Sequence, residues 1–300
     1  MKRQKLHPKG PEFSKLAVGL WRMNEWNLTT DQTIAWIEHC IELGITTFDH
    51  ADIYGMYQNE ELFGNAIKQK PSLLDEIELV TKCDICLVSE NRPENSINHY
   101  NTTPEHIITS VERSLKNLNA EVLDLVLIHR PDPLMDASAT ADAFMKLIEQ
   151  GKIKHIGVSN FTPSQVDLLQ SRLDVPIVTN QVEFSLHRLD PIFDGTFDQA
   201  QRMEASPMLW SPFAGGAIFK EHDERTQQIR NTANKLCEKY ECELDQIILA
   251  WLMMIPSNPI PVLGTGKTER ITSGTKACNI KLERQDWFKL LVASQGHPVP

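Results

Sequence analysis

The side chains of this 300-residue chain that could do chemistry follow three predicted strands. Asp49 lies at the end of one strand and Tyr54 five residues further on; Lys82 ends the next strand, and His129 the one after it. A tyrosine, with an ordinary pKa of about 10, is a slow proton donor at neutral pH. A neighbouring ammonium favours the phenolate and lowers that pKa, and Lys82 could supply this charge.

The other two side chains complete this chemistry. A buried lysine tends to lose its proton unless it is paired, and Asp49 is the available partner. His129 could donate a hydrogen bond to a substrate oxygen. Such a set suits the protonation of a carbonyl oxygen as negative charge develops on it. Each member also has a structural interpretation, as a buried ion pair, a satisfied core histidine or a packed tyrosine, but their coincidence on three strands favours the functional one.

The elements that must position these residues form a regular alternation. Short apolar, β-branched runs alternate with amphipathic helical patterns, and several runs are apolar on both faces, as in parallel strands covered on both sides. The predicted strands are 15–20, 46–50, 77–82, 123–129, 153–159, 177–184, 208–212 and 260–263. Eight strand–helix units without a dividing linker predict an α/β fold, a closed (β/α)8 TIM barrel, with residues 1–300 as a single domain. A doubly wound open sheet is the alternative, but no G-x-G-x-x-G follows the first strand.

Local signals place helix ends and loops. Thr103 and Thr162, each followed by proline, are typical of helix starts, and Gly151 of a helix end. The polar, turn-rich residues 84–102 predict a long loop insertion. Residues 288–300 are expected to form a short C-terminal tail.

Composition argues against several classes of function. With 30 Lys and Arg against 40 Asp and Glu, the formal net charge is −10, so a nucleic-acid partner is not expected. The longest apolar run, 247–255, is far shorter than the roughly 20 residues that span a bilayer, and the N-terminus lacks the apolar stretch of a secretory signal. We therefore expect no membrane association and a cytoplasmic protein with reduced cysteines.

Cys83 and Cys86 have the two-residue spacing of redox and zinc motifs. A structural zinc site needs four ligands, and the nearest second pair, Cys237 and Cys242, has a different spacing. We expect two cysteines that follow a buried strand and no metal site, with a redox role left open.

Several segments in order carry a family pattern over nearly the whole chain. They are 44–55 (GITTFDHADIYG), 81–82 (TK), 123–129 (LDLVLIH), 152–161 (KIKHIGVSNF), 180–183 (NQVE) and 211–216 (SPFAGG). With them the chain resembles the aldo-keto reductase superfamily, specifically its short bacterial oxidoreductases. The resemblance implies an NADP-dependent oxidoreductase that reduces aldehydes or ketones to alcohols by reversible hydride transfer. It also assigns roles: Tyr54 as general acid, Lys82 lowering its pKa, Asp49 pairing with that lysine, and His129 orienting the carbonyl.

The resemblance further implies a site for NADP(H). The matching positions are Ser159, Asn160, Gln181, Trp210, Ser211, Pro212, Phe213, Ala214, Gly215, Gly264, Thr265, Gly266, Lys267 and Arg270. The first three match residues that hydrogen-bond the carboxamide, Trp210 matches an aromatic residue that stacks on the nicotinamide, and 211–215 match a loop over the pyrophosphate. The turn 264–266 feeds a helix start, which is a ready anion site. There Lys267 and Arg270 favour NADP(H) over NAD(H), because a 2′-phosphate requires positive charge.

The predicted substrate pocket contains Trp21, Tyr54 and His129, and takes a small-molecule carbonyl or alcohol. Arg130 stands where many relatives have tryptophan, which removes an apolar wall. Only 13 residues follow Trp287, so a long pocket-closing C-terminal loop is missing, and we expect an open pocket. Many members of the family that the chain resembles are monomeric, so the resemblance implies a monomer.

Two other functions remain as alternatives. One is metal-dependent hydrolysis by His50, Asp52 and His129; strand alternation turns His50 away from Asp49, which argues against it. The other is a cofactor-binding sensor subunit, and the intact catalytic set argues against that.

Overall fold

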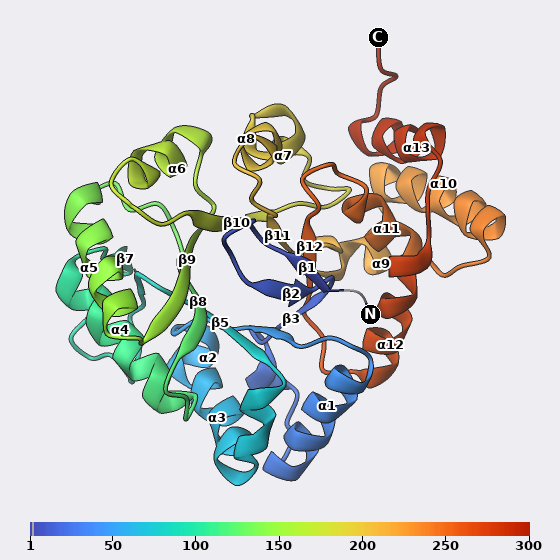
Figure 1. The fold of residues 1–300 in the computed structure, drawn as a ribbon. Coiled ribbons are helices and arrows are strands. Elements are labelled where there is room, and N and C mark those ends of the chain that lie inside the picture. The colour runs from blue at the N-terminus through green and yellow to red at the C-terminus, as the bar shows by residue number, and fades with distance from the viewer. Residues whose placement is uncertain (2) are drawn as a thin grey trace.

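Eight parallel strands close into a barrel (Figure 1) in the computed structural model, which describes residue 1 and residues 3–300. Around the barrel they are β3 (Ala17–Gly19), β4 (Thr47–Asp49), β5 (Glu78–Cys83), β8 (Leu123–Ile128), β9 (Ile153–Ser159), β10 (Ile177–Glu183), β11 (Met208–Trp210) and β12 (Ile260–Leu263). The eight predicted strands and the (β/α)8 TIM barrel are confirmed, with strand ends that differ by one or two residues. Three strands end where the next residue is left-handed without being glycine, which breaks an extended chain: Asp84 (φ 103°), Asn160 (φ 61°) and Ser211 (φ 58°).

Helices surround the barrel (Figure 1). The longer ones are α1 (Thr30–Glu42), α3 (Asn59–Gln69), α4 (Pro104–Asn117), α5 (Ala137–Glu149), α6 (Pro163–Gln170), α8 (Thr196–Arg202), α10 (Glu224–Tyr240), α11 (Leu244–Met253), α12 (Thr268–Lys276) and α13 (Arg284–Gln295), and the single turns are α2 (Tyr54–Tyr57), α7 (Asp190–Phe193) and α9 (Ala217–Lys220). Thr103 and Thr162 cap α4 and α6 through their side chains, and Gly151 follows α5 with φ 69°, as predicted. No helix in the described part of the chain is long and apolar enough to cross a membrane.

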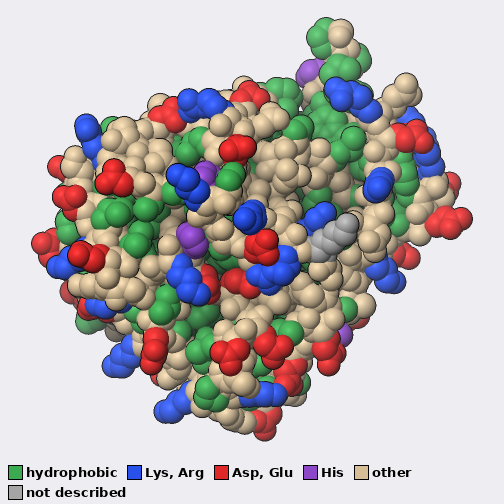
Figure 2. Space-filling view, viewed as in Figure 1, with side chains coloured by type: hydrophobic (Ala, Val, Ile, Leu, Met, Phe, Trp, Pro, Cys, Tyr) green, Lys and Arg blue, Asp and Glu red, His purple; other side chains and the backbone are tan. Residues whose placement is uncertain are grey.

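A hairpin that the sequence analysis did not predict covers the amino end of the barrel. Its strands β1 (Arg3–Lys5) and β2 (Glu12–Ser14) pair antiparallel and lie across the centre of the barrel in Figure 1. Leu6 and Phe13 are fully buried in one cluster with barrel residues such as Val80 and Leu125. Figure 2 shows this face, where acidic and basic side chains are intermingled. Leu6 and Phe13 close the amino end of the barrel with apolar side chains, so a polar active site is expected at the carboxyl end.

The insertion at 84–102 is a loop, as predicted, with a two-residue antiparallel pair, β6 (Ile85–Cys86) and β7 (His99–Tyr100), inside it. The loop is tied to the turn that carries Tyr54. The Tyr57 hydroxyl accepts from the Leu87 amide at 2.7 Å, and the Arg92 guanidinium lies 4.3 Å from the Tyr57 ring centroid.

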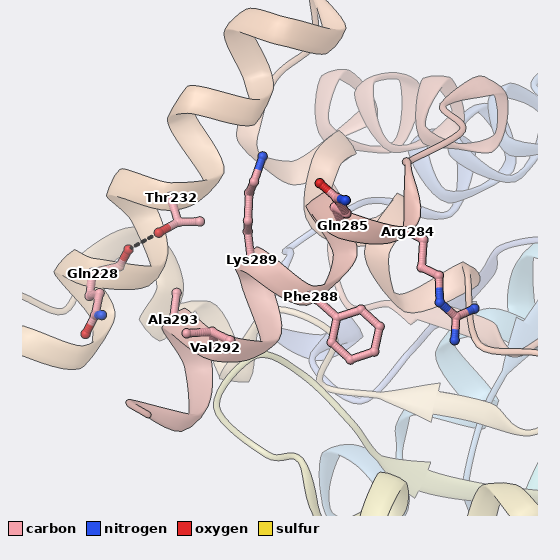
Figure 3. Close-up of a pocket in the computed structure, with 8 residues that line it drawn as sticks. All are labelled: Gln228, Thr232, Arg284, Gln285, Phe288, Lys289, Val292 and Ala293. Atoms are coloured by element: carbon pink, nitrogen blue, oxygen red, sulfur yellow. Dashed lines mark hydrogen bonds between the residues drawn. The ribbon is translucent and has the colours of Figure 1, made fainter. Parts of the chain in front are cut away.

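The short C-terminal tail expected at 288–300 is helical as far as Gln295. Helix α13 runs to Gln295 and packs beside α10 (Figure 1). It is held because Leu290 is fully buried and Trp287 stacks on Trp251 with 5.2 Å between ring centroids. A surface groove of about 630 Å³ lies between α10 and α13, lined by residues such as Thr232 and Phe288 (Figure 3). None of the predicted site residues lines it.

Candidate active site

The carboxyl ends of β4, β5 and β8 bring together Asp49, Tyr54, Lys82 and His129, which we call the tetrad. The Lys82 Nζ lies 2.7 Å from Asp49 Oδ1 and 3.3 Å from Tyr54 Oη, and it also donates to the His50 carbonyl at 2.7 Å. The rings of Tyr54 and His129 meet edge to face, 5.8 Å apart. The structure therefore assembles the four side chains that the sequence placed on three separate strands.

Lys82 is fully buried, yet its surroundings keep it charged. Burial by itself lowers the pKa of Lys82, but the Asp49 carboxylate and the Tyr54 phenol outweigh burial and leave the pKa above its ordinary value. The site thus holds a permanent ammonium against the tyrosine hydroxyl.

Tyr54 differs from the expectation that its pKa is lowered. Burial raises the pKa of Tyr54; Lys82 opposes this, Asp49 adds to it, and the net direction is upward. The hydroxyl therefore carries its proton at neutral pH, as a proton donor must, and the role of Lys82 is to limit the rise.

His129 is held in its neutral form. Burial, followed by the charges of Lys82 and Arg130, places the pKa of His129 well below its ordinary value. A neutral imidazole carries one N–H donor, so His129 can offer a hydrogen bond to a substrate oxygen without adding a positive charge.

The turn that carries Tyr54 has an unusual backbone. Gly55, Met56 and Tyr57 all have positive φ, at 58°, 54° and 72°, and a Cβ at Gly55 would lie 2.0 Å from the Asn59 side chain. Asn59 in turn donates to the carbonyls of Leu20 and Trp21, at 2.8 and 3.0 Å. A glycine and a buried asparagine thus hold this turn against the end of β3.

Trp21 follows β3 by two residues, but it is 62% exposed, and its ring lies against the Arg22 guanidinium. Among the described residues no aromatic pairing or hydrogen bond joins this ring to the tetrad, so its place in a pocket wall stays a prediction.

A hydrogen-bond chain links the tetrad to the residues expected at the carboxamide. Gln181 Nε2 donates to Asp49 Oδ1 at 2.9 Å, and Ser159 Oγ donates to the Gln181 carbonyl at 2.8 Å. Asn160 Nδ2 donates to Ser159 Oγ at 2.8 Å, and the Trp210 indole N–H donates to Asn160 Oδ1 at 2.9 Å. The strand ends of β9, β10 and β11 therefore form one polar wall that continues from Asp49.

The residues expected at the phosphates lie on two partly exposed turns. In the loop 211–216, Gly215 and Gly216 have positive φ, and the Gly215 amide donates to Ser211 Oγ at 2.9 Å. A Cβ at Gly215, Gly216 or Gly264 would meet no atom within 4 Å, so space is open beside these backbones. Helix α12 begins with no side-chain cap on its first amides.

Lys267 and Arg270 are exposed at the start of α12. Neither forms an ion pair with any other described residue. Uncapped amides and two free cations suit an anion.

Asp84 is a functional candidate that the sequence analysis missed. It is fully buried two residues after Lys82, and both of its carboxylate oxygens lie 3.3 Å from the Arg130 amide. Its own carbonyl accepts from the Asn101 amide at 2.8 Å. Asp84 therefore ties the turn after His129 to the loop 84–102. Its residue type and its position in the sequence did not indicate this role, because its contact with the Arg130 amide joins segments that follow two different strands.

Asp84→Ala is expected to lower kcat/KM for a test aldehyde about tenfold, because the His129–Arg130 turn loses its acceptor. Asp84→Asn keeps one acceptor oxygen, so its kcat/KM should fall less than about threefold. Steady-state kinetics of both variants test this. Equal losses in the two variants would contradict the role of the acceptor oxygen.

Cys83, Cys86 and His50, the other candidate groups, lie in surroundings that fit a structural role. Burial raises the pKa of Cys86 to about 11 and that of Cys83 well above its ordinary value, so both stay protonated thiols. His50 packs on Phe63 of α3 at 4.6 Å, on the face away from Asp49, as strand alternation predicted. Burial and the charge of Lys82 lower the pKa of His50 to about 3.

Comparison with known proteins identifies the class that this fold and site define. The sequence model of the Aldo/keto reductase family matches residues 15–291. The chain is 46% identical to the oxidoreductase YdhF of Escherichia coli, over 100% of both chains. It is 39% identical to a 6-dehydroglucose reductase of Agrobacterium fabrum, over 96% of both.

A solved structure agrees with this class. The crystal structure of a thermostable aldo-keto reductase in complex with the inhibitor epalrestat superposes with a TM-score of 0.82 and 26% identity, covering 98% of this chain and 100% of the other. The protein belongs to the aldo/keto reductase family. It is an oxidoreductase of that family.

Proposed function

We propose that the protein catalyses the reversible, NADPH-dependent reduction of aldehydes or ketones to alcohols. The observation that carries this proposal is the buried ammonium of Lys82, held between Asp49 at 2.7 Å and the Tyr54 hydroxyl at 3.3 Å. A protonated phenol beside a permanent positive charge can release its proton and be stabilised as a phenolate. A carbonyl oxygen that gains negative charge needs such a donor.

Each tetrad residue has a distinct task in this proposal. Tyr54 Oη donates its proton to the carbonyl oxygen, and Lys82 stabilises the phenolate that remains. Asp49 keeps the lysine charged in its buried position. His129 donates a hydrogen bond to the same carbonyl oxygen and so orients it. In alcohol oxidation the same proton returns to the phenolate.

The chain fits a nicotinamide cofactor, which when bound supplies or accepts the hydride. The polar wall of Ser159, Asn160 and Gln181 offers amide and hydroxyl groups for a carboxamide. Trp210 is partly exposed beside it and presents an aromatic surface. The open glycine turns and the uncapped start of α12 offer backbone amides for phosphates.

The cations at the start of α12 support a preference for NADP(H). Lys267→Glu is expected to raise the Kd of NADPH at least tenfold and to change that of NADH by less than threefold, because an ion pair with the 2′-phosphate is replaced by repulsion. Fluorescence titration of both cofactors measures this. Lys281→Glu, another exposed lysine, is the control for a general change of charge. Equal weakening of NADPH and NADH would exclude the 2′-phosphate contact.

Oxidation of NADPH by the purified protein with 4-nitrobenzaldehyde, followed by absorbance, tests the function directly. A hydroxylated aldehyde such as glyceraldehyde is a second probe, chosen because one relative is named a 6-dehydroglucose reductase. Tight NADPH binding without turnover of any aldehyde would favour the sensor function. Turnover that requires added zinc and ignores NADPH would favour hydrolysis. We also propose that the protein is a cytoplasmic monomer, as expected from its sequence.

A further inference from the structure

Arg130 is a partly buried cation at the end of β8, directly after His129. No described residue gives its guanidinium an ion pair or a side-chain hydrogen bond; its polar contacts, at 3.3 Å to Asp84, are made by its backbone amide. The guanidinium lies over the Trp210 ring, 5.6 Å from its centroid. An arginine that is partly removed from water and has five free donors is unusual in a chain with ten more acidic than basic residues.

Two acidic side chains close to Arg130 in the fold are already bound elsewhere. Asp84 accepts from backbone, and Asp132 accepts from the Thr102 hydroxyl at 2.8 Å and from the Leu134 amide at 2.8 Å. The turn is thus fixed by Asp84, while no described residue forms an ion pair or a hydrogen bond with the guanidinium. It stays positioned by stacking on Trp210.

The charge of Arg130 also reaches the reacting groups. It contributes to lowering the pKa of His129, after burial and Lys82, and it is a minor cause that lowers the pKa of Tyr54. Arg130 directly follows His129, and its guanidinium lies over Trp210 of the polar wall, so it belongs to the same mouth of the barrel. A substrate whose carbonyl lies at Tyr54 and His129 would extend its other atoms into this mouth.

We propose that Arg130 determines specificity by binding a carboxylate or phosphate group carried by the carbonyl substrate. The proposal rests on the proposed function and names the substrate class of that site. A guanidinium binds both oxyanions through two parallel hydrogen bonds. Tryptophan at this position would offer one neutral N–H donor in place of the charge and the paired donors of the guanidinium.

Two aldehydes of similar shape and different charge test the proposal. 4-Carboxybenzaldehyde and 4-nitrobenzaldehyde both carry a planar group with two oxygens, but only the first is an anion. Arg130→Gln is expected to lower kcat/KM for the carboxylate about 10- to 100-fold, mainly through KM, and to change that for the nitro compound less than threefold. Arg130→Lys should recover part of the loss. Arg172→Gln, an exposed arginine in the connection between α6 and β10, is the matched control for lost charge.

A second pair of aldehydes distinguishes binding of a phosphate from binding of a carboxylate, and both from binding of neutral hydroxyl groups. Glyceraldehyde 3-phosphate against glyceraldehyde asks whether phosphate is bound as carboxylate is. A large loss in Arg130→Gln for either anionic aldehyde, relative to its neutral partner, supports the proposal and identifies the anion. Equal losses for charged and neutral members of both pairs would overturn it, as would a tenfold rise in the Kd of NADPH, which would assign Arg130 to the cofactor.

Binding separates failure of this proposal from failure of the proposed function. Isothermal titration of 4-carboxybenzaldehyde into the NADP⁺-loaded protein needs no turnover. If the wild type oxidises no NADPH with any aldehyde, the proposed function fails. Binding of the anion that weakens at least tenfold in Arg130→Gln still supports the anion site, and equal binding by both proteins overturns it.

Discussion

Tyr54→Phe is expected to lower kcat for 4-nitrobenzaldehyde reduction about 10²- to 10⁴-fold, because a positioned general acid contributes that much. The substitution removes the hydroxyl that lies 3.3 Å from Lys82 and keeps the ring that meets His129 edge to face. Binding of NADPH should stay within threefold of the wild type. Stopped-flow or steady-state absorbance gives kcat, and fluorescence titration gives the Kd.

Tyr100→Phe is the matched control, since Tyr100 is 41% exposed on β7 and takes no part in the tetrad. Its kcat should equal that of the wild type. A Tyr54→Phe enzyme that keeps more than a third of wild-type kcat would exclude Tyr54 as the proton donor. Solvent or another side chain would then have to supply the proton.

The eight strands could be predicted from the sequence because each is a short apolar run, and these runs alternate regularly with helical patterns. The runs at 125–128 and 156–159 are buried on both faces, so composition and length sufficed. Tetrad residues followed from the fold, because strand ends in a closed barrel meet at one mouth whatever their separation in the chain.

Features that depend on contacts between distant segments could not be predicted. The strand β1 reads Arg-Gln-Lys, which has no apolar pattern, and its hairpin is stable because Phe13 and Leu6 fill the barrel end. The pKa of Tyr54 could not be predicted either. The residue types name the lysine that lowers it, but the larger effect is burial.

Asp84 and Arg130 illustrate the same limit at the site. In the sequence, Asp84 belongs to a polar loop and Arg130 to a strand end, and no nearby residue forms a recognisable motif with either of them. The structure joins them, because the carboxylate of one binds the backbone amide of the other across β5 and β8. That no described residue binds the Arg130 guanidinium through a hydrogen bond or an ion pair could be seen only in the structure.

Lys82→Met is expected to abolish measurable reduction and to lower the free energy of unfolding by about 3–5 kcal/mol, because it leaves the buried Asp49 carboxylate without its cation. Asp49 is 2% exposed, so water cannot replace the ammonium. Chemical denaturation measures the stability loss. Lys154→Met is the matched control: it breaks an ion pair with Asp124 in which the lysine side chain is 58% exposed, and it should cost at most about 1 kcal/mol.

The double variant Asp49→Asn/Lys82→Met separates the structural from the catalytic role of the pair. With the carboxylate replaced by a neutral amide, no buried charge is left unpaired, and the amide oxygen can still accept from Gln181 Nε2, as Asp49 Oδ1 does at 2.9 Å. Most of the lost stability should therefore return, while reduction stays absent because no ammonium remains to stabilise the Tyr54 phenolate. Recovery of both stability and turnover in the double variant would mean that Lys82 serves only to neutralise Asp49. Recovery of neither would mean that the lysine's bond to the His50 carbonyl, at 2.7 Å, holds the end of β4 in place.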